Sequence, residues 1–310
     1  MKKGVKIFSV ELTLWILTLL IIFFSIAVLR YSIFKRLKSN SAPAFLESEK
    51  IQREVFGKIM PHHDIKIAGS GSNLPLVKVL ASIYRQINPQ SEITVYESIG
   101  SSGGVKALRD GVIDIGLVSR PLKDGEKKYG FLEIPYARTI AVIGVSSDVL
   151  DDGISTKELI EIYSGRKKRW RDGRWITVFQ RESSDSTNEV FFRFLPEFRK
   201  ANEEAYKTHR FRVIFTDREM LDAINESSGG IGPVDSGAIV SQRLPIKQLK
   251  INGILPSYEN VENGLYPYVK TLSFLLRKDG TNEAKEFVEF CLSAKMSEVI
   301  LSQGYLLPKK

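Results

Sequence analysis

The chain has 310 residues, 43% hydrophobic and 26% charged, which is the composition of a folded globular protein with room for one large two-lobed domain or two ordinary ones. The single cysteine, Cys291, excludes an internal disulfide framework and a zinc site of several thiolates, and three histidines leave little for a histidine-rich metal site. Residues 1–40 contain seven basic side chains and one acidic side chain, so most of the net charge of +9 lies there. The rest of the chain is only mildly basic.

An uncharged apolar run at residues 12–29 predicts a transmembrane helix. As a helix it would reach about 27 Å, close to the roughly 30 Å of a bilayer core. The run is longer than a usual signal-peptide core, and basic residues follow it. We therefore expect an N-terminal tip and uncleaved anchor over residues 1–34, with cleavage as the alternative, and then a stalk or linker over residues 35–64.

From Ile65 onward, short β-branched runs alternate with helical patterns, which is typical of an α/β fold with mostly parallel sheets. The predicted strands are residues 65–68, 93–96, 113–118, 139–145, 175–179, 212–215, 249–251 and 272–276. The predicted helices are residues 74–87, 103–110, 156–162, 188–194, 218–224 and 282–302.

Three polar loops, at residues 69–73, 100–104 and 181–187, each leave a predicted strand and open a helix. Their glycines let the backbone approach a ligand, and a helix N-terminus presents free N–H groups at the positive end of its dipole. A single loop of this kind could simply cap its helix. Three of them, the third headed by Arg181, favour a shared oxyanion pocket. Neither glycine loop has the spacing of a nucleotide-binding loop.

These loops, in this order, resemble those of the phosphate-binding proteins of bacterial ABC phosphate importers, over roughly residues 65–310. The matching segments are GSGSNLPL (69–76), SIGSSGGVKAL (98–108), DIGLVSRPL (114–122), ELIEIYSGRKKRWRDGRWI (158–176), GIGP (230–233) and QGYLLP (303–308).

The resemblance implies a two-lobed type II periplasmic-binding-protein fold that closes on its ligand. Lobe 1 would comprise about residues 65–138 and 255–310, and lobe 2 about residues 139–254. The resemblance also implies export. The N-terminal tip would then be cytoplasmic, on the inner side of the inner (cytoplasmic) membrane, and the binding domain would be periplasmic or extracellular.

Carried over residue by residue, the resemblance also implies a set of anion-binding residues. Asn73 and Leu74 would offer backbone N–H groups, and Ser101 would offer its hydroxyl and its N–H. Arg181 would supply the formal positive charge, and Thr187 would donate from the start of a lobe 2 helix.

Three positions depart from the family's pattern. Arg120 stands where the family carries an aspartate that accepts the proton of hydrogen phosphate; Asp185-Ser186-Thr187 replaces Ser-Gly-Thr, and Asn73-Leu74 replaces Thr-Phe. Loss of the acceptor would weaken the rejection of sulfate, which has no proton to donate. Asp185 would either restore an acceptor from the opposite lobe or pair with Arg120 or Arg181 and close the pocket.

Other chemistry finds little support in the sequence. His209 has no nucleophile signature near it, and Cys291 lies in an apolar helical run, so we expect neither an enzyme nor a metal or other cofactor. The basic run at residues 166–174, flanked by Trp175, is interpreted as a solvated turn that steers anions, with no nucleic acid as partner.

The function hypothesis is a membrane-anchored extracytoplasmic solute-binding protein for phosphate or a related oxyanion. Its partners would be an ABC permease and the inner membrane, contacted through residues 12–29. The alternative is a non-transport sensor or scaffold with the same fold and altered or lost anion binding.

Overall fold

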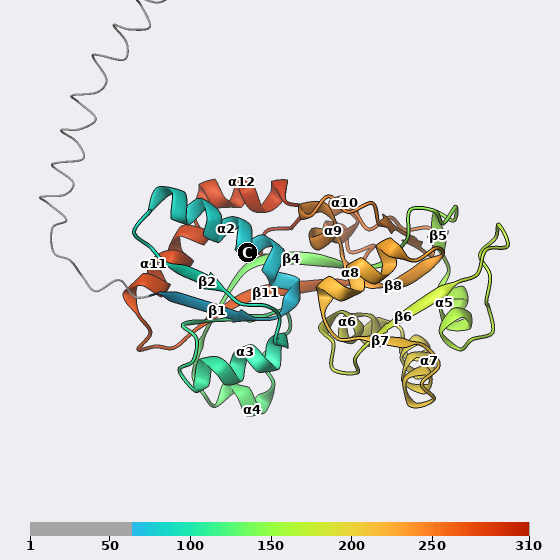
Figure 1. Cartoon of the computed structure of the whole chain (residues 1–310), viewed down its shortest axis with the longest axis horizontal. Coiled ribbons are helices and arrows are strands. Elements are labelled where there is room, and N and C mark those ends of the chain that lie inside the picture. Colours follow the sequence, from blue (N-terminus) through green and yellow to red (C-terminus); the bar gives the residue numbers. More distant parts are fainter. Residues whose placement is uncertain (1–63, 310) are drawn as a thin grey trace, which may run out of the picture. The chain divides into compact units, whose positions relative to one another are not determined.

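The structure, a computed structural model, describes residues 64–309 (Figure 1). The predicted anchor at residues 12–29 and almost all of the predicted stalk lie outside the described residues. Among the described residues, no helix combines the length and apolar character needed to cross a bilayer.

The first lobe is built on three parallel strands in the order β2-β1-β3: β1 (Ile65–Gly69), β2 (Ile93–Val95) and β3 (Ile115–Val118). Helices cover both faces of these strands, so every residue of β3 is buried (Figure 1). One face carries α2 (Leu74–Ile87), α11 (Asn282–Cys291) and α12 (Ala294–Ser302), and the other carries α3 (Gly100–Arg109). The short elements η1 (Gly71–Asn73) and α4 (Asp124–Lys127) complete this lobe.

The second lobe repeats this plan with three parallel strands in the order β8-β6-β7. These strands are β6 (Thr177–Arg181), β7 (Arg212–Ile214) and β8 (Gly230–Asp235). The helices are α5 (Thr156–Tyr163), α6 (Ser186–Phe194), α7 (Pro196–Lys207), α8 (Asp217–Glu226), α9 (Ser236–Ser241) and α10 (Tyr258–Glu262). Three two-residue strands, β5 (Gly153–Ile154), β9 (Lys247–Gln248) and β10 (Lys250–Ile251), lie at its edge.

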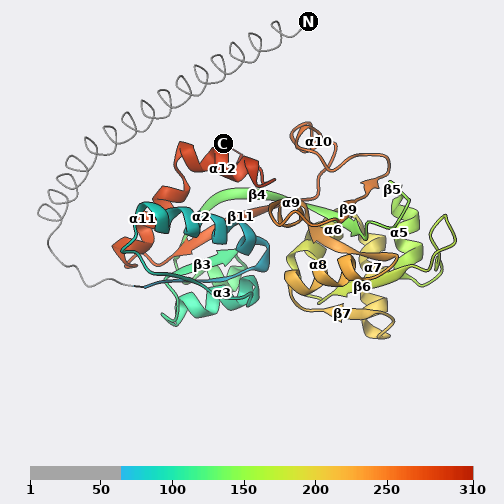
Figure 2. The same ribbon diagram turned by 45° about the horizontal axis from the view of Figure 1, so that its top comes forward.

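Two long strands, β4 (Leu132–Val145) and β11 (Val269–Leu276), join the lobes (Figure 2). β4 pairs antiparallel with β11 up to Ile140 and antiparallel with β8 from Ala141 onward. The lobes therefore share one mixed sheet, and the prediction of mostly parallel sheets is wrong at its centre. The physical reason is that β4 and β11 carry the chain between the lobes in opposite directions.

Separate hydrophobic cores mark the two lobes. Val261, Tyr266 and Tyr268 pack in the core of the second lobe. The chain therefore re-enters the first lobe at about Lys270, later than the expected boundary at residue 255.

Most predicted elements are present, and the differences have local causes. The predicted helix at 282–302 is two helices, because the Ser293 hydroxyl accepts a hydrogen bond from the Met296 N–H and starts α12. α7 was not predicted because its buried stripe is only Phe198, Asn202 and Ala205. β8 was not predicted because its sequence, GIGPVD, contains the residues typical of turns.

Candidate functional site

A cavity of about 300 Å³ lies between the lobes, beyond the carboxyl ends of their parallel strands. The loops after β1, β2 and β3 line it from the first lobe, and the loops after β6 and β7 line it from the second. The N-termini of α3, α6 and α8 all reach this lining. Because the first N–H groups of a helix lack intrahelical acceptors and carry the positive end of its dipole, each of these helix ends favours a negative group beside it.

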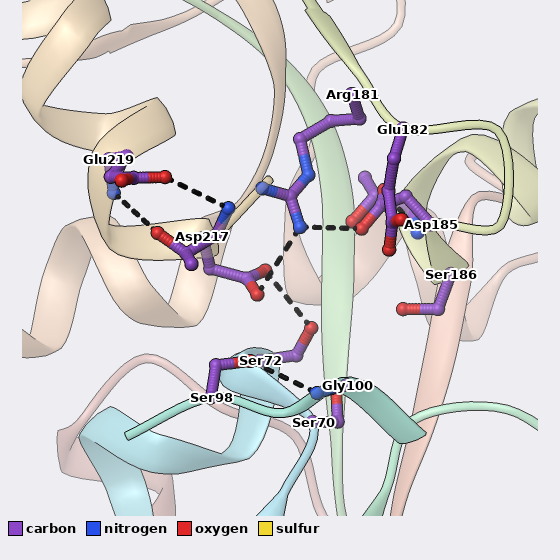
Figure 3. A network of polar contacts seen from close by, with 12 residues as sticks. Ser70, Ser72, Ser98, Gly100, Arg181, Glu182, Asp185, Ser186, Asp217 and Glu219 are labelled. Carbon is purple, nitrogen blue, oxygen red and sulfur yellow. Dashed lines mark hydrogen bonds and ion pairs between the residues drawn. The ribbon is translucent and has the colours of Figure 1, made fainter. Parts of the chain in front are cut away.

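Arg181, the last residue of β6, supplies a buried cation to the cavity wall, with 4% of its surface exposed. Its Nη2 donates to Asp185 Oδ2 at 2.8 Å and lies 3.5 Å from Asp217 Oδ2 (Figure 3). Burial opposes its charge, but these two carboxylates raise the pKa of Arg181 above its ordinary value. Its Nη1 has no hydrogen-bond partner within residues 64–309, so one donor group of a permanent cation is left unsatisfied.

Asp185 caps α6 and pairs with Arg181. Its Oδ1 accepts from the Thr187 N–H at 3.0 Å and the Asn188 N–H at 3.2 Å, while its Oδ2 accepts from Arg181. Burial works against the charged carboxylate, but Arg181 and Lys270 outweigh it and lower the pKa of Asp185. Of the two alternatives for Asp185, the structure contains the pair with Arg181, and Arg120 is not its partner.

Arg120 lines the cavity but is neutralised by Glu126, which the sequence analysis did not single out. The two Nη atoms of Arg120 donate to the two carboxylate oxygens of Glu126, each at 2.8 Å. Hydrogen bonds from Arg120 lower the pKa of Glu126. Arg120 also donates to the Ser102 hydroxyl at 2.9 Å, so it braces the N-terminus of α3.

Of the expected anion-binding residues, the structure brings Ser101, Arg120, Arg181, Asp185 and Ser186 together at the cavity. The Ser101 hydroxyl accepts from the Ser119 N–H at 3.3 Å, which leaves its own proton for another acceptor.

The structure does not bring Asn73, Leu74 or Thr187 to the cavity lining. The N–H groups of Asn73 and Leu74 donate instead to the carbonyl oxygens of Ser70 and Gly71 within the tight turn of η1. The Thr187 hydroxyl accepts from Lys270 at 2.8 Å.

Asp217, the first residue of α8, is a lining residue that the sequence analysis missed. A Cβ atom at Gly71 would lie 2.1 Å from its Oδ2, so the carboxylate of the second lobe sits directly against a glycine of the first. Ser72 also donates to Asp217 Oδ1 at 3.4 Å (Figure 3). The available signal was its position after a predicted strand at the start of a helix, as in the three loops that were singled out.

Lys270 was also missed, because a single lysine in the apolar start of a strand gives no sequence signal. Its side chain is fully buried beside Asp235 at 2.7 Å. It also donates to the hydroxyls of Ser72 at 2.7 Å and Thr187 at 2.8 Å, which lie on opposite lobes. Burial raises the pKa of Asp235, and Lys270 opposes that shift.

Carboxylates outnumber guanidinium groups in the lining. Arg120 and Arg181 face Asp185, Asp217 and Glu182, and Glu126 stands behind Arg120. The formal charges of the lining therefore give no excess of cations.

The predicted basic turn lies on the second lobe and is partly paired within the chain. Lys167 contacts Glu158 at 2.7 Å, Arg174 contacts Asp148 at 2.5 Å, and Arg169 stacks over Trp175 with 3.8 Å to the ring centre. Trp170 is buried and donates to the Gly229 carbonyl.

Two α/β lobes joined by crossing strands, with a polar cavity between them, define a two-lobed ligand-binding domain. Residues 48–295 match the family model described as PBP superfamily domain, and the chain belongs to that superfamily.

Curated relatives and solved structures agree with this assignment. The phosphate-binding protein PstS of Bacillus subtilis (strain 168) is 25% identical over 280 residues, which cover 87% of this chain and 85% of the relative. The phosphate-binding protein PstS of Borreliella burgdorferi is 23% identical, and the match covers 78% of this chain and 89% of the relative. A Clostridium perfringens protein described as a phosphate ABC transporter substrate-binding protein with bound phosphate superposes with a TM-score of 0.70. It is 21% identical, and the match covers 80% of this chain and 100% of that one. An ABC-type phosphate transport receptor from Vibrio cholerae superposes with a TM-score of 0.57 at 24% identity. The match covers 79% of this chain and 100% of that one.

Proposed function

We propose that this protein is a solute-binding receptor for phosphate or a related oxyanion that delivers its ligand to an ABC importer. The relatives named above are phosphate-binding proteins, and the match extends over most of each chain. The observation that carries the proposal is Arg181, a buried cation in the cavity wall with one Nη group unpartnered within the described chain. The role is binding and release rather than catalysis.

The anion would lie where the N-termini of α3, α6 and α8 converge. Ser101 and the first N–H groups of α3 would bind it from the first lobe, and Arg181 would bind it from the second. Closing the lobes excludes water and strengthens each charge-assisted hydrogen bond.

One observation favours the second candidate, a sensor or scaffold with altered or lost anion binding. Each guanidinium group at the cavity already contacts a carboxylate: Arg120 contacts Glu126, and Arg181 contacts Asp185 and Asp217. A cavity neutralised from within would close without a ligand.

Isothermal titration of the full chain in detergent, stripped of bound anion, with phosphate and then sulfate at constant ionic strength tests the receptor proposal. We expect Arg181→Ala to weaken phosphate binding by roughly 2–3 kcal/mol, about 30- to 150-fold, because a charged hydrogen bond is lost. Arg199→Ala, which removes a surface partner of Glu203 in the same lobe, is the matched control and should leave affinity unchanged. Absence of heat from both anions in the wild type would move the protein to the sensor or scaffold class.

The proposal includes an N-terminal anchor that holds the binding domain outside the inner membrane. Its support is the apolar run at residues 12–29, flanked by basic residues. Tethering would raise the concentration of the receptor near its permease. The full chain should remain with membranes after a high-salt wash, whereas a chain starting at residue 45 should be released. A full chain found in the soluble fraction contradicts the anchor.

A further inference from the structure

A line of three buried hydroxyls connects the cavity to Lys270. The Ser70 Oγ lies 2.7 Å from the Ser119 Oγ, and the Ser119 Oγ lies 2.8 Å from the Ser186 Oγ. Lys270 Nζ then lies 3.4 Å from the Ser186 Oγ. Ser70 and Ser186 line the cavity, whereas Ser119 lies behind it.

Lys270 is buried and fully hydrogen-bonded at the other end of this line. Its ammonium group makes three short contacts, with Ser72, Thr187 and Asp235, at 2.7–2.8 Å. An ammonium group has three protons and no acceptor, so these contacts take its hydrogen bonds, and its charge attracts the nearby Ser186 oxygen.

The charge gives the line of hydroxyls a direction. A hydroxyl has a single proton, and beside a cation it turns its oxygen to the charge and its proton away. This argument predicts that Ser186 donates to Ser119 and that Ser119 donates to Ser70. The proton of Ser70 is left for the cavity.

The line crosses from one lobe to the other. Ser70 and Ser119 follow β1 and β3 of the first lobe, and Ser186 begins α6 of the second. It therefore forms only where the lobes meet. The outer end of the line, at Ser70, lies at the cavity lining. It would add a hydrogen-bond donor there, where carboxylates outnumber guanidinium groups.

We propose that Lys270 is a positioning residue for the anion site, which turns the Ser186, Ser119 and Ser70 hydroxyls so that Ser70 presents its proton to a bound oxyanion. This inference rests on the proposed function. Lys270 itself does not touch the ligand and acts through the hydroxyls.

A double-mutant cycle on the full chain in detergent tests this inference, with phosphate titrated calorimetrically. We expect Ser119→Ala, which interrupts the line without changing any charge, to weaken phosphate binding about fivefold, and Lys270→Met at least as much. The double variant should bind no more weakly than Lys270→Met alone, because both changes break one line. Ser241→Ala, which removes a hydroxyl bonded to Gln303, is the control and should leave affinity unchanged.

Losses that multiply in the double variant, or an unchanged affinity in Ser119→Ala, would overturn the inference. A merely structural role of Lys270 would not produce this coupling. Because Lys270→Met leaves Asp235 buried without its cation, the cycle is also run with the paired change Lys270→Met/Asp235→Asn in place of Lys270→Met, which removes both charges together.

A wild type that binds neither phosphate nor sulfate would refute the proposed function. The cycle is then read from urea unfolding. A midpoint in the double variant equal to that of Lys270→Met supports the line of hydroxyls, and additive shifts overturn it.

Discussion

Arg120 and Arg181 reach the same cavity with different consequences for a ligand. Glu126 contacts Arg120 through both carboxylate oxygens, so this guanidinium group is neutralised and bound on one edge. Arg181 contacts Asp185 and Asp217 through Nη2 and retains Nη1 without a partner among the described residues. Arg120 therefore braces the first lobe, whereas Arg181 keeps one donor group that no described side chain or carbonyl satisfies.

Asp217→Asn tests how far the lining carboxylates oppose an anion. Asp217 is 22% exposed at its side chain and lies 3.5 Å from Arg181, the longer of the two carboxylate contacts of Arg181. Removing its charge lessens repulsion of the ligand, so phosphate affinity should rise about fivefold, or roughly 1 kcal/mol. Titration calorimetry at constant ionic strength measures the change. Asp222→Asn, which removes a surface partner of Arg218 on the same helix, should change nothing, and weaker binding by Asp217→Asn would contradict the argument.

At the scale of single elements, local side-chain contacts determine where the helices begin. The Ser155 hydroxyl accepts from the Glu158 N–H at 3.1 Å, and Glu158 Oε2 accepts from the Ser155 N–H at 3.0 Å, so α5 starts in a capping box. Lys167 contacts the other oxygen of Glu158 at 2.7 Å and ties the basic turn to this helix. These contacts lower the pKa of Glu158 to about 2, first through Lys167 and then through the Ser155 N–H.

The lowered pKa of Glu158 makes α5 sensitive to acid. Its ordinary value is 4.5, so its contribution to stability is fully present above pH 4.5 and is lost as the pH falls towards 2. Glu158→Gln should lower the free energy of unfolding at pH 7 by about 0.5–1 kcal/mol, a modest value because the side chain is 41% exposed. Urea unfolding between pH 7 and 2.5 should show the difference shrinking in acid. Glu161→Gln on the same helix is the control, and a difference that stays constant with pH would refute the assignment.

Elements with a strong local signal were predicted well. α2 has an apolar face and a proline near its start, and its predicted bounds match. α7 and β8 lacked such a signal: α7 is largely polar, and β8 is buried between β4 and β6 despite its glycines and proline. Burial of β8 comes from its neighbours in the sheet and not from its own composition.

At the scale of the whole binding domain, the lobes meet through small residues and hydroxyls. Gly71 of the first lobe lies against Asp217 of the second, and Ser119 lies against Ser186. Tyr305 of the first lobe also packs against Gly237 of the second, so apolar contact accompanies these polar ones.

Gly71→Ala should hinder lobe closure, because its Cβ would lie 2.1 Å from Asp217 Oδ2. Moving that carboxylate aside would disturb its contacts with Arg181 and Ser72. We expect about tenfold weaker phosphate binding, roughly 1.4 kcal/mol. Small-angle scattering with saturating phosphate should show a larger radius of gyration than in the wild type. Gly125→Ala, where a Cβ meets nothing within 4 Å, should behave as wild type. Equal compaction of both variants would mean that Gly71 does not limit closure.

The alternation of strands and helices, the polar loops at the ends of strands, and the place of Arg181 at the head of one loop could all be predicted from the amino-acid sequence. These features depend on local patterns: apolar periodicity, turn residues and helix caps. Which charges pair became clear from the folded arrangement of the chain. Glu126 neutralises Arg120, Asp185 and Asp217 approach Arg181, and Lys270 reaches hydroxyls of both lobes. Glu126 follows Arg120 in the first lobe and Asp185 follows Arg181 in the second, whereas Lys270 meets Ser72 and Thr187 only because β11 joins the lobes. Pairing depends on distances of a few ångströms, and sequence spacing does not encode those distances.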